Sequence, residues 1–263
     1  MEWTTEDQAA LRRAKTLLEH PSVAMRIANT VGVPIEKVLA SLPEGAAVAV
    51  RGATTKAMHA ALHAATSMMD DRPRVSADRL HMLAAAASGA AGGAFGIAAL
   101  AAELPVSTTI MLRSIADIAR SEGHSIVAPE VKLRCLEVFA LGGPGHGDDA
   151  AESGYFAVRA ALARAITEAA EYLAIRGISG EAGPAVVGLM TKIAARFGIP
   201  VTEKLMAQSV PIIGAAGGAA INVLFIRHFQ DVARGHFTVL RLEGKYGTGA
   251  VAAAYRSTRA PNR

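Results

Sequence analysis

Apolar side chains recur every three or four residues along most of this chain, which is the spacing of one face of an α-helix. In residues 5–20, for example, Leu11, Ala14, Leu17 and Leu18 fall on one face. No stretch shows the apolar–polar alternation of a half-buried strand. The pattern therefore predicts an all-α fold, a single helical bundle.

Proline, glycine and capping residues indicate where the predicted helices begin and end. Pro105 is expected to end one helix, Ser107 to cap the next, and Pro129 to open a third. The sequence GGPGHG at 142–147 is the best candidate for a flexible surface loop. The predicted helices span residues 5–20, 22–31, 34–42, 43–70, 76–104, 107–123, 129–141, 148–176, 184–197 and, with Pro211 inside it, 198–246.

We divide the chain into three parts. Residues 1–42 form an N-terminal helical extension, and residues 43–246 form the main helical domain. Residues 247–263 are rich in glycine, alanine and arginine without periodicity, so we expect a flexible basic tail.

Two long segments carry no charged residue. They are MLAAAASGAAGGAFGIAALAA at 82–102 and LMAQSVPIIGAAGGAAINVLFI at 205–226. Each is long enough to span a bilayer, which takes about 20 residues. Alanine and glycine favour insertion little, so we expect two buried Gly/Ala-rich helices, with reversible membrane insertion or spanning as the alternatives.

Glycines in these segments recur four residues apart, which places them on one helix face where another backbone can approach closely. Each glycine costs roughly 0.5 to 1 kcal/mol relative to alanine in an ordinary helix. Such a concentration favours tight helix packing or a ligand passage. The glycines are Gly89, Gly92, Gly93, Gly96, Gly214 and Gly218.

Composition agrees with a closely packed helical protein. Alanine fills 56 and glycine 25 of the 263 positions, while aromatic residues make up only 5%. The 51% hydrophobic content excludes a disordered chain. Cys135 is the single cysteine and the N-terminus MEWTTEDQ lacks a signal-peptide pattern, so we expect a cytoplasmic protein. The net charge of +4 supports contact with an acidic membrane surface only weakly, and no nucleic-acid-binding module is visible.

The two glycine runs form an internal echo, because each leads toward a similar charged octet. RSIADIAR covers 113–120 and RHFQDVAR covers 227–234. The spacing places an Arg-Asp-Arg cluster on one helix face in each octet, either as ordinary surface ion pairs or as a site for a phosphate or lipid headgroup. These candidate binding residues are Arg113, Asp117, Arg120, Arg227, Asp231 and Arg234.

Three runs carry a resemblance to a known family. ELPVSTTIMLRSIADIARSEG, PEVKLRCLEVFALGG and VPIIGAAGGAAINVLFIRHFQDVARGHFTVLRLEGKYG together resemble the EcsC protein family over about residues 40–246. The family is named for a protein encoded beside an ABC transporter. The resemblance implies an alanine-rich helical fold and a membrane or transport context, and it supplies no reaction and no catalytic residues.

A search for catalytic chemistry finds little. His59 and His63 have the spacing of a two-histidine metal face, but HAALH lacks the glutamate of a zincin, so we expect no metal. No P-loop or G-x-S-x-G motif occurs, and no cofactor is implied. Asp148, after the glycine loop, is most simply a helix cap, and Cys135 an inert buried thiol. Glu103 could be a base at a pocket mouth, although a solvated helix end is favoured.

The sequence leaves three functional hypotheses. The first is a cytoplasmic helical protein, peripheral at the inner face of the membrane, that binds lipid or a membrane-protein partner. The family resemblance implies an ABC transporter as one candidate partner. The second is a hydrolase of unrecognised mechanism acting on lipid or peptide, and the third is a soluble carrier of an apolar ligand. The sequence assigns no catalytic residues.

Overall fold

A computed structural model of the chain describes residues 2–19, 46–66, 77–95, 97–143, 151–176, 183–208 and 214–258. These residues form nine α-helices and no strand, which confirms the predicted all-α fold. The helices are α1 (Thr5–Leu18), α4 (Ala46–Thr66), α5 (Asp78–Phe95), α6 (Ile97–Ser121), α7 (Pro129–Leu141), α8 (Ala151–Arg176), α9 (Pro184–Gln208), α10 (Gly214–Tyr246) and α11 (Thr248–Ser257).

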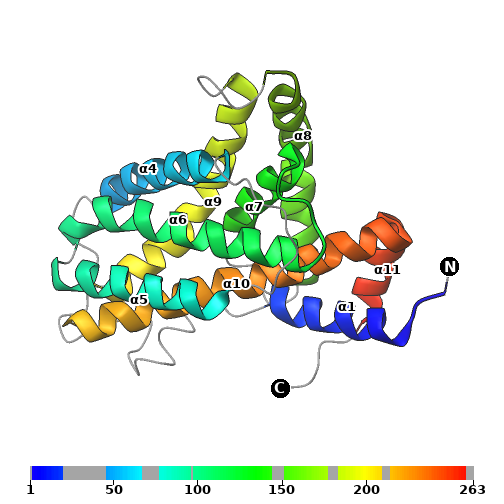
Figure 1. Ribbon diagram of the computed structural model, residues 1–263, viewed down its shortest axis with the longest axis horizontal. Coiled ribbons are helices and arrows are strands. Elements are labelled where there is room, and N and C mark those ends of the chain that lie inside the picture. Colours follow the sequence, from blue (N-terminus) through cyan, green and yellow to red (C-terminus); the bar gives the residue numbers. More distant parts are fainter. Residues whose placement is uncertain are drawn as a thin grey trace.

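Helix α10 is the longest and runs across the molecule (Figure 1). It packs against α1, α5 and α6, while α4 lies on the other side of α6. Helix α9 rises steeply past α4 and packs on α4, α7 and α8. The α4–α9 contact therefore lies at the face of the bundle away from α1 (Figure 1).

Four phenylalanines form the centre of the core where α7, α9 and α10 meet. Phe139, Phe197, Phe225 and Phe229 are almost fully buried, with ring centroids 4.9 to 6.2 Å apart in tilted or edge-on pairs. A Cβ at Gly142, just after α7, would lie 2.3 Å from the Phe229 ring, so this close approach requires glycine.

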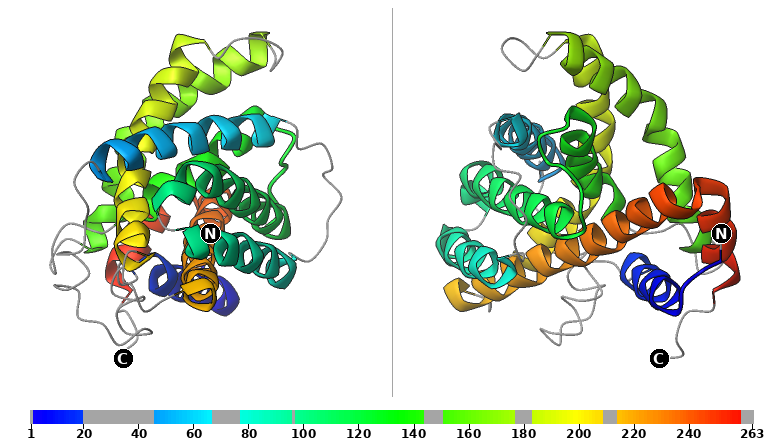
Figure 2. Two further views of the ribbon diagram at one scale, coloured as in Figure 1. Left: turned by 90° about the vertical axis from the view of Figure 1, so that its left-hand side faces the viewer. Right: turned by 45° about the vertical axis from the view of Figure 1, so that its right-hand side comes forward.

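The two glycine-rich runs lie on helices that pack together. Helices α5 and α10 are antiparallel, because Asp78 contacts Arg234 while Ala85 accepts a hydrogen bond from Asn222 (Figure 2, right). Because the two helices run in opposite directions, the later residues Gly89, Gly92 and Gly93 of α5 lie toward the start of α10. This start carries Gly214 and Gly218. The role of these glycines in packing stays a prediction.

The predicted break at Pro105 is wrong. Helix α6 runs without interruption from Ile97 to Ser121, and Ser107 lies inside it, its hydroxyl donating to the Leu104 carbonyl at 3.2 Å. Proline removes one backbone hydrogen bond at a cost of about 3 kcal/mol or more in a helix interior. Burial of the apolar residues Leu104, Met111 and Leu112 of α6 offsets this cost, and α5 ends earlier, at Phe95.

The predicted end of a helix at Phe197 is also wrong, because α9 continues through Pro200 to Gln208. Phe197, Val201 and Leu205 lie four residues apart and are all buried. Their common face holds the helix against the core beyond the proline.

The expectation of a flexible tail from residue 247 is wrong for most of that segment. Residues Thr248–Ser257 form α11, and Val251 and Tyr255 are fully buried. Gly247, with φ +86°, provides the turn that folds α11 back from α10. Helix α1 packs on α10 and α11, so the N-terminal helix is part of the same bundle.

Several sequence predictions lie outside the described residues. They concern the helices at 22–31 and 34–42, the N-cap Ser76, the charged break at 71–74, Gly96, residues 144–150 with Asp148, and Pro211.

Candidate functional site

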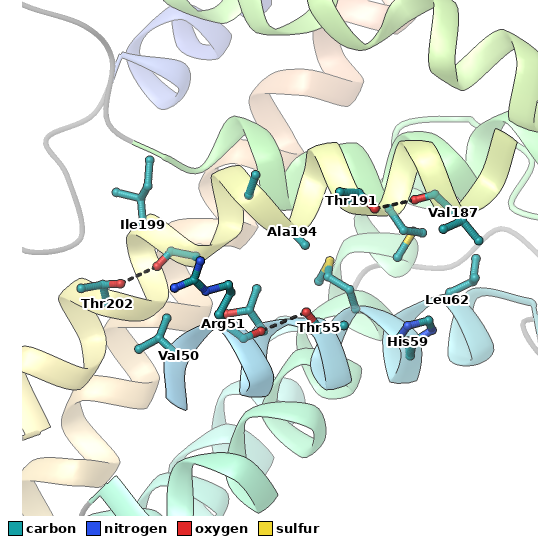
Figure 3. Close-up of a pocket in the computed structure, with 15 residues that line it drawn as sticks. Val50, Arg51, Thr55, His59, Leu62, Val187, Thr191, Ala194, Ile199 and Thr202 are labelled. Carbon is teal, nitrogen blue, oxygen red and sulfur yellow. Dashed lines mark hydrogen bonds between the residues drawn. The ribbon is translucent and has the colours of Figure 1, made fainter. Parts of the chain in front are cut away.

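A groove of about 600 Å³ lies between α4 and α9, a volume typical of small-molecule sites. Residues from 50 to 62 of α4 and from 187 to 202 of α9 face each other across it (Figure 3). Aliphatic and methionine side chains line most of the groove, namely Val50, Met58, Leu62, Val187, Met190 and Ile199.

Threonines in the groove wall present little polarity to a ligand. The hydroxyls of Thr55, Thr191 and Thr202 donate to the carbonyls four residues earlier, at 2.7 to 3.0 Å (Figure 3). Because the hydroxyl is engaged by its own helix, it needs no partner in the groove. Thr54 also lines the groove, and its buried hydroxyl has no hydrogen-bond partner among the described residues.

The ionisable side chains that line the groove are basic. Arg51 and His59, both on α4, are its only ionisable lining residues in the part of the chain that the structure describes. Arg51 lies toward the end that Val50, Ile199 and Thr202 form, and His59 lies toward Leu62 (Figure 3). No aspartate or glutamate is among the lining residues.

Helix α9 combines this groove with an exposed apolar surface. Within the described residues, its segment Pro184–Leu205 is the one stretch long and apolar enough to cross a membrane, with a mean hydropathy of 1.3. A core helix of a soluble protein can pass the same test. In α9, however, Val187 and Ile199 are 47% and 43% exposed, so part of its apolar surface is not covered by the bundle.

Below the groove, α9 is anchored by a buried polar cluster. The Lys204 ammonium donates to both carboxylate oxygens of Glu103 on α6, at 2.9 and 2.8 Å. Asn222 of α10 donates to Glu103 at 2.8 Å and to the Ala85 carbonyl at 3.0 Å. Burial alone would raise the pKa of Glu103, but the Lys204 charge and these hydrogen bonds outweigh it and hold the pKa below its ordinary value.

This cluster corrects the expectation that Glu103 sits in water at a helix end. The side chain is buried and ion-paired, and Lys204 is fully buried. A carboxylate whose pKa is lowered and whose oxygens are occupied is a poor general base.

A second buried network joins α7, α8 and α10. The Tyr155 hydroxyl lies 2.9 Å from Nδ1 of His236, whose Nε2 lies 3.4 Å from Glu137. Burial lowers the pKa of His236 and raises that of Tyr155, so both groups are neutral and Nδ1 of the ring accepts a hydrogen bond from the tyrosine hydroxyl. Arg134 donates to Glu137 at 2.9 Å. All of Tyr155, His236 and Glu137 are nearly inaccessible to solvent, which makes a stabilising role the simplest one.

The two predicted Arg-Asp-Arg faces are not in the groove. Both contact the first turn of α5, where His81 contacts Asp117 at 2.9 Å and Asp78 pairs with Arg234. Asp117 also pairs with Arg120, as the three-residue spacing predicts. Arg227 and Arg113 are exposed, with Arg227 donating to the Met82 sulfur at 3.2 Å, and Asp231 is partly buried. The structure thus shows these octets contacting α5, and headgroup binding at them stays a prediction.

The remaining candidates fall in different places. His59 lines the groove and His63 is exposed one turn away. No group of three or more His, Cys, Asp or Glu side chains that could hold a metal occurs among the described residues. Cys135 is buried as predicted, and burial raises its thiol pKa to about 12.

Sequence reasoning missed the groove and Arg51. One feature of the sequence points to the apolar helix α9: the segment Pro184–Val201 contains only Lys192 and Arg196 as charged residues. The pairing of α9 with α4, more than a hundred residues earlier, is a tertiary contact that periodicity does not encode.

Comparison with known proteins gives one match. A family model described as the EcsC protein family matches residues 6–242, a span that begins earlier than the resemblance at 40–246 indicated. No curated protein and no solved structure matches.

Proposed function

Because the chain belongs to the EcsC protein family, and because α4 and α9 form an apolar groove, we propose that it is a membrane-associated protein that binds the acyl chain of a lipid. We further propose that it acts at the cytoplasmic face of the membrane. Family membership supplies no reaction, so the argument rests on the geometry of the groove.

The observation that carries the proposal is the chemical character of the groove. It is elongated, follows two paired helices, and is lined mainly by apolar side chains, and three of its four threonines donate their hydroxyls to carbonyls of their own helices. A single flexible hydrocarbon chain matches such a site, because burying apolar area gives about 25 cal/mol per Å² without requiring a fixed pattern of polar partners.

Helix α9 supports the membrane part of the proposal. Its segment Pro184–Leu205 is apolar, and Val187 and Ile199 leave part of that surface exposed at the groove. Exposed apolar surface in the wall of a groove is typical of membrane or partner contact. A lipid could then pass from the bilayer to the groove without crossing water.

The hydrolase alternative has less support. The carboxylates Glu103 and Glu137 are buried in contact with Lys204 and Arg134, respectively, and neither lines the groove. A lipid-binding role needs no catalytic base.

The test uses two glycines of α9 that both face open space. A Cβ at Gly198, which lines the groove, or at Gly188, which does not, would meet no atom within 4 Å. Replacing either by leucine should not reduce stability, since leucine is about 0.8 kcal/mol more favourable than glycine in a helix. Only Gly198→Leu fills the groove.

We expect lipid to co-purify with the wild-type protein and with Gly188→Leu, as identified by mass spectrometry of an organic extract. Gly198→Leu should lose most of this lipid and bind added fatty acid at least about tenfold more weakly. Equal lipid content in the two variants, or no lipid in any of the three proteins, would contradict the proposal.

Flotation with vesicles separates membrane association from soluble transport. We expect the wild-type protein to float with vesicles that contain anionic lipid. Lipid co-purification without flotation would instead favour the soluble carrier of an apolar ligand.

A further inference from the structure

We propose that the α4/α9 groove selects an anionic amphiphile, whose charged head pairs with Arg51 while its chain lies between the two helices. This inference rests on the proposed lipid-binding function and adds the chemical class of the ligand head. A carboxylate or a phosphate carries the required charge, so a free fatty acid and an anionic phospholipid are the two sources.

Charge around Arg51 provides the first argument. The side chain of Arg51 is exposed at the groove, and no carboxylate among the described residues forms an ion pair with it. The groove contains no acidic lining residue. A cationic head would therefore meet repulsion, whereas an anion would meet a guanidinium that no carboxylate of the described residues engages.

Position provides the second argument. Arg51 lies near one end of the groove with Val50 and Thr202, and the apolar wall continues from it toward Leu62 and Val187 (Figure 3). Along α4, Arg51 and Leu62 are separated by about 17 Å at 1.5 Å per residue. A charged group at one end of an elongated apolar site matches an amphiphile with a single head and an extended chain.

Exposure of Arg51 makes this end accessible. The Arg51 side chain is exposed to solvent, so a ligand head there stays partly hydrated while the chain is buried. Pairing at this site avoids the full cost of burying two charges, which makes a net gain in affinity attainable.

The experiment compares three ligands with the same chain and different heads, namely laurate, lauryl phosphate and lauryl alcohol. The two anions are kept below their micelle concentrations and the alcohol below its solubility limit. Binding to the full-length protein is measured by isothermal titration calorimetry. We expect the two anions to bind at least about tenfold more tightly than the alcohol, because only an anion forms a charge-assisted hydrogen bond with the Arg51 guanidinium.

Two substitutions on α4 provide the matched pair. Arg51→Gln should remove the preference for the anions and leave the affinity for lauryl alcohol nearly unchanged. Lys56→Gln removes the same charge from an exposed position of α4 outside the groove and should keep the preference. Unfolding curves of both variants should coincide with that of the wild-type protein.

Equal affinity for all three heads, or a preference that persists in Arg51→Gln, would overturn this inference while the apolar groove still binds chains. No binding of any of the three ligands would overturn the proposed function as well. The ratio of laurate to lauryl phosphate affinity then indicates which source the site prefers, and mass spectrometry of co-purified lipid identifies it.

Discussion

Among single residues, the buried charged side chains hold the helices together. These helices are rich in alanine and glycine and have few large apolar side chains to pack. Lys204, Glu103 and Asn222 connect α9, α6 and α10 through four short hydrogen bonds, one of them to the backbone of α5. The Lys204 ammonium also lies 5.1 Å from the centre of the Phe225 ring. Each partner is expensive to bury alone, so the cluster specifies one arrangement of these helices.

Removing one member of this cluster should be costly. We predict that Lys204→Met lowers the free energy of unfolding by about 3 to 5 kcal/mol, because it leaves the Glu103 charge buried without its partner. The double variant Glu103→Gln/Lys204→Met should recover most of the loss, since glutamine still accepts from Asn222. Urea unfolding measures both. Lys192→Met, at an exposed position of α9, is the control and should change little.

The interpretation of the cluster would be wrong if the single and double variants were equally unstable. That result would mean that the loss comes from packing of the lysine chain rather than from an unpaired carboxylate.

Asp7 gives a prediction for pH. Hydrogen bonds from Lys245 at 2.6 Å and Tyr246 at 2.7 Å lower the pKa of Asp7 well below its ordinary value. A carboxyl with a lowered folded-state pKa contributes stability that is fully present above its unfolded value of about 3.9, and this contribution shrinks gradually as the pH falls from there toward the folded-state pKa. Asp7→Asn should therefore destabilise the protein most at about pH 7 and by a clearly smaller amount at about pH 2.

Thermal or urea unfolding at the two pH values tests the Asp7 prediction, with the exposed neighbour Glu6→Gln as control. A destabilisation by Asp7→Asn that does not depend on pH would show that the charge is not responsible.

At the scale of elements, the position of a glycine decides where helices can cross. Helix α1 packs on α10 at Gly235, where a Cβ would lie 2.7 Å from Leu18 Cγ and 3.0 Å from the Ala14 carbonyl. Further along α10, a Cβ at Gly244 would meet nothing within 4 Å. A larger residue would therefore clash with α1 at Gly235 but would be accommodated at Gly244 of the same helix.

We predict that Gly235→Ala destabilises the protein by about 1 to 3 kcal/mol, because α1 must shift away from α10. Gly244→Ala should instead stabilise it by up to about 1 kcal/mol through helix propensity. Unfolding free energies and hydrogen exchange in α1 measure the effects. Faster exchange confined to α1 in Gly235→Ala is expected, and a stabilising Gly235→Ala would rule out the tight crossing.

At the scale of the whole molecule, the two ends of the described chain support each other (Figure 2). Lys15 of α1 donates to the carbonyls of Tyr255 and Thr258, at 3.1 and 2.8 Å, at the end of α11. A cation at the C-terminus of a helix satisfies carbonyls that have no partner within the helix. Trp3 stacks on Tyr246 at 4.2 Å, which links the chain before α1 to the end of α10.

Tyr255 tests whether α11 belongs to the folded body. Its ring is fully buried and lies near Tyr155 and Phe156, with centroids 6.0 and 5.1 Å away. We predict that Tyr255→Ala lowers the free energy of unfolding by about 3 to 5 kcal/mol, as is typical of deleting a buried aromatic ring. Arg256→Ala, the exposed neighbour, should be nearly neutral. A neutral Tyr255→Ala would restore the expectation of a loose C-terminal tail.

Periodicity, caps and motifs are local properties, so they were enough to predict the helical class, the family, most helix positions and the buried Cys135. They failed where tertiary burial outweighs a local signal. Helices α6 and α9 continue through Pro105 and Pro200 because buried residues flank both prolines. Helix α11 forms from a weakly periodic segment because Val251 and Tyr255 are buried in the core.

Only the tertiary structure decided which side chains meet. The sequence identified Glu103 and the arginine octets as isolated candidates, and packing paired Glu103 with Lys204 and brought the octets to α5. The groove and its exposed Arg51 exist only because α9 lies beside α4. Contacts between segments so distant in sequence depend on the packing of the whole chain, and no local pattern of residues records them.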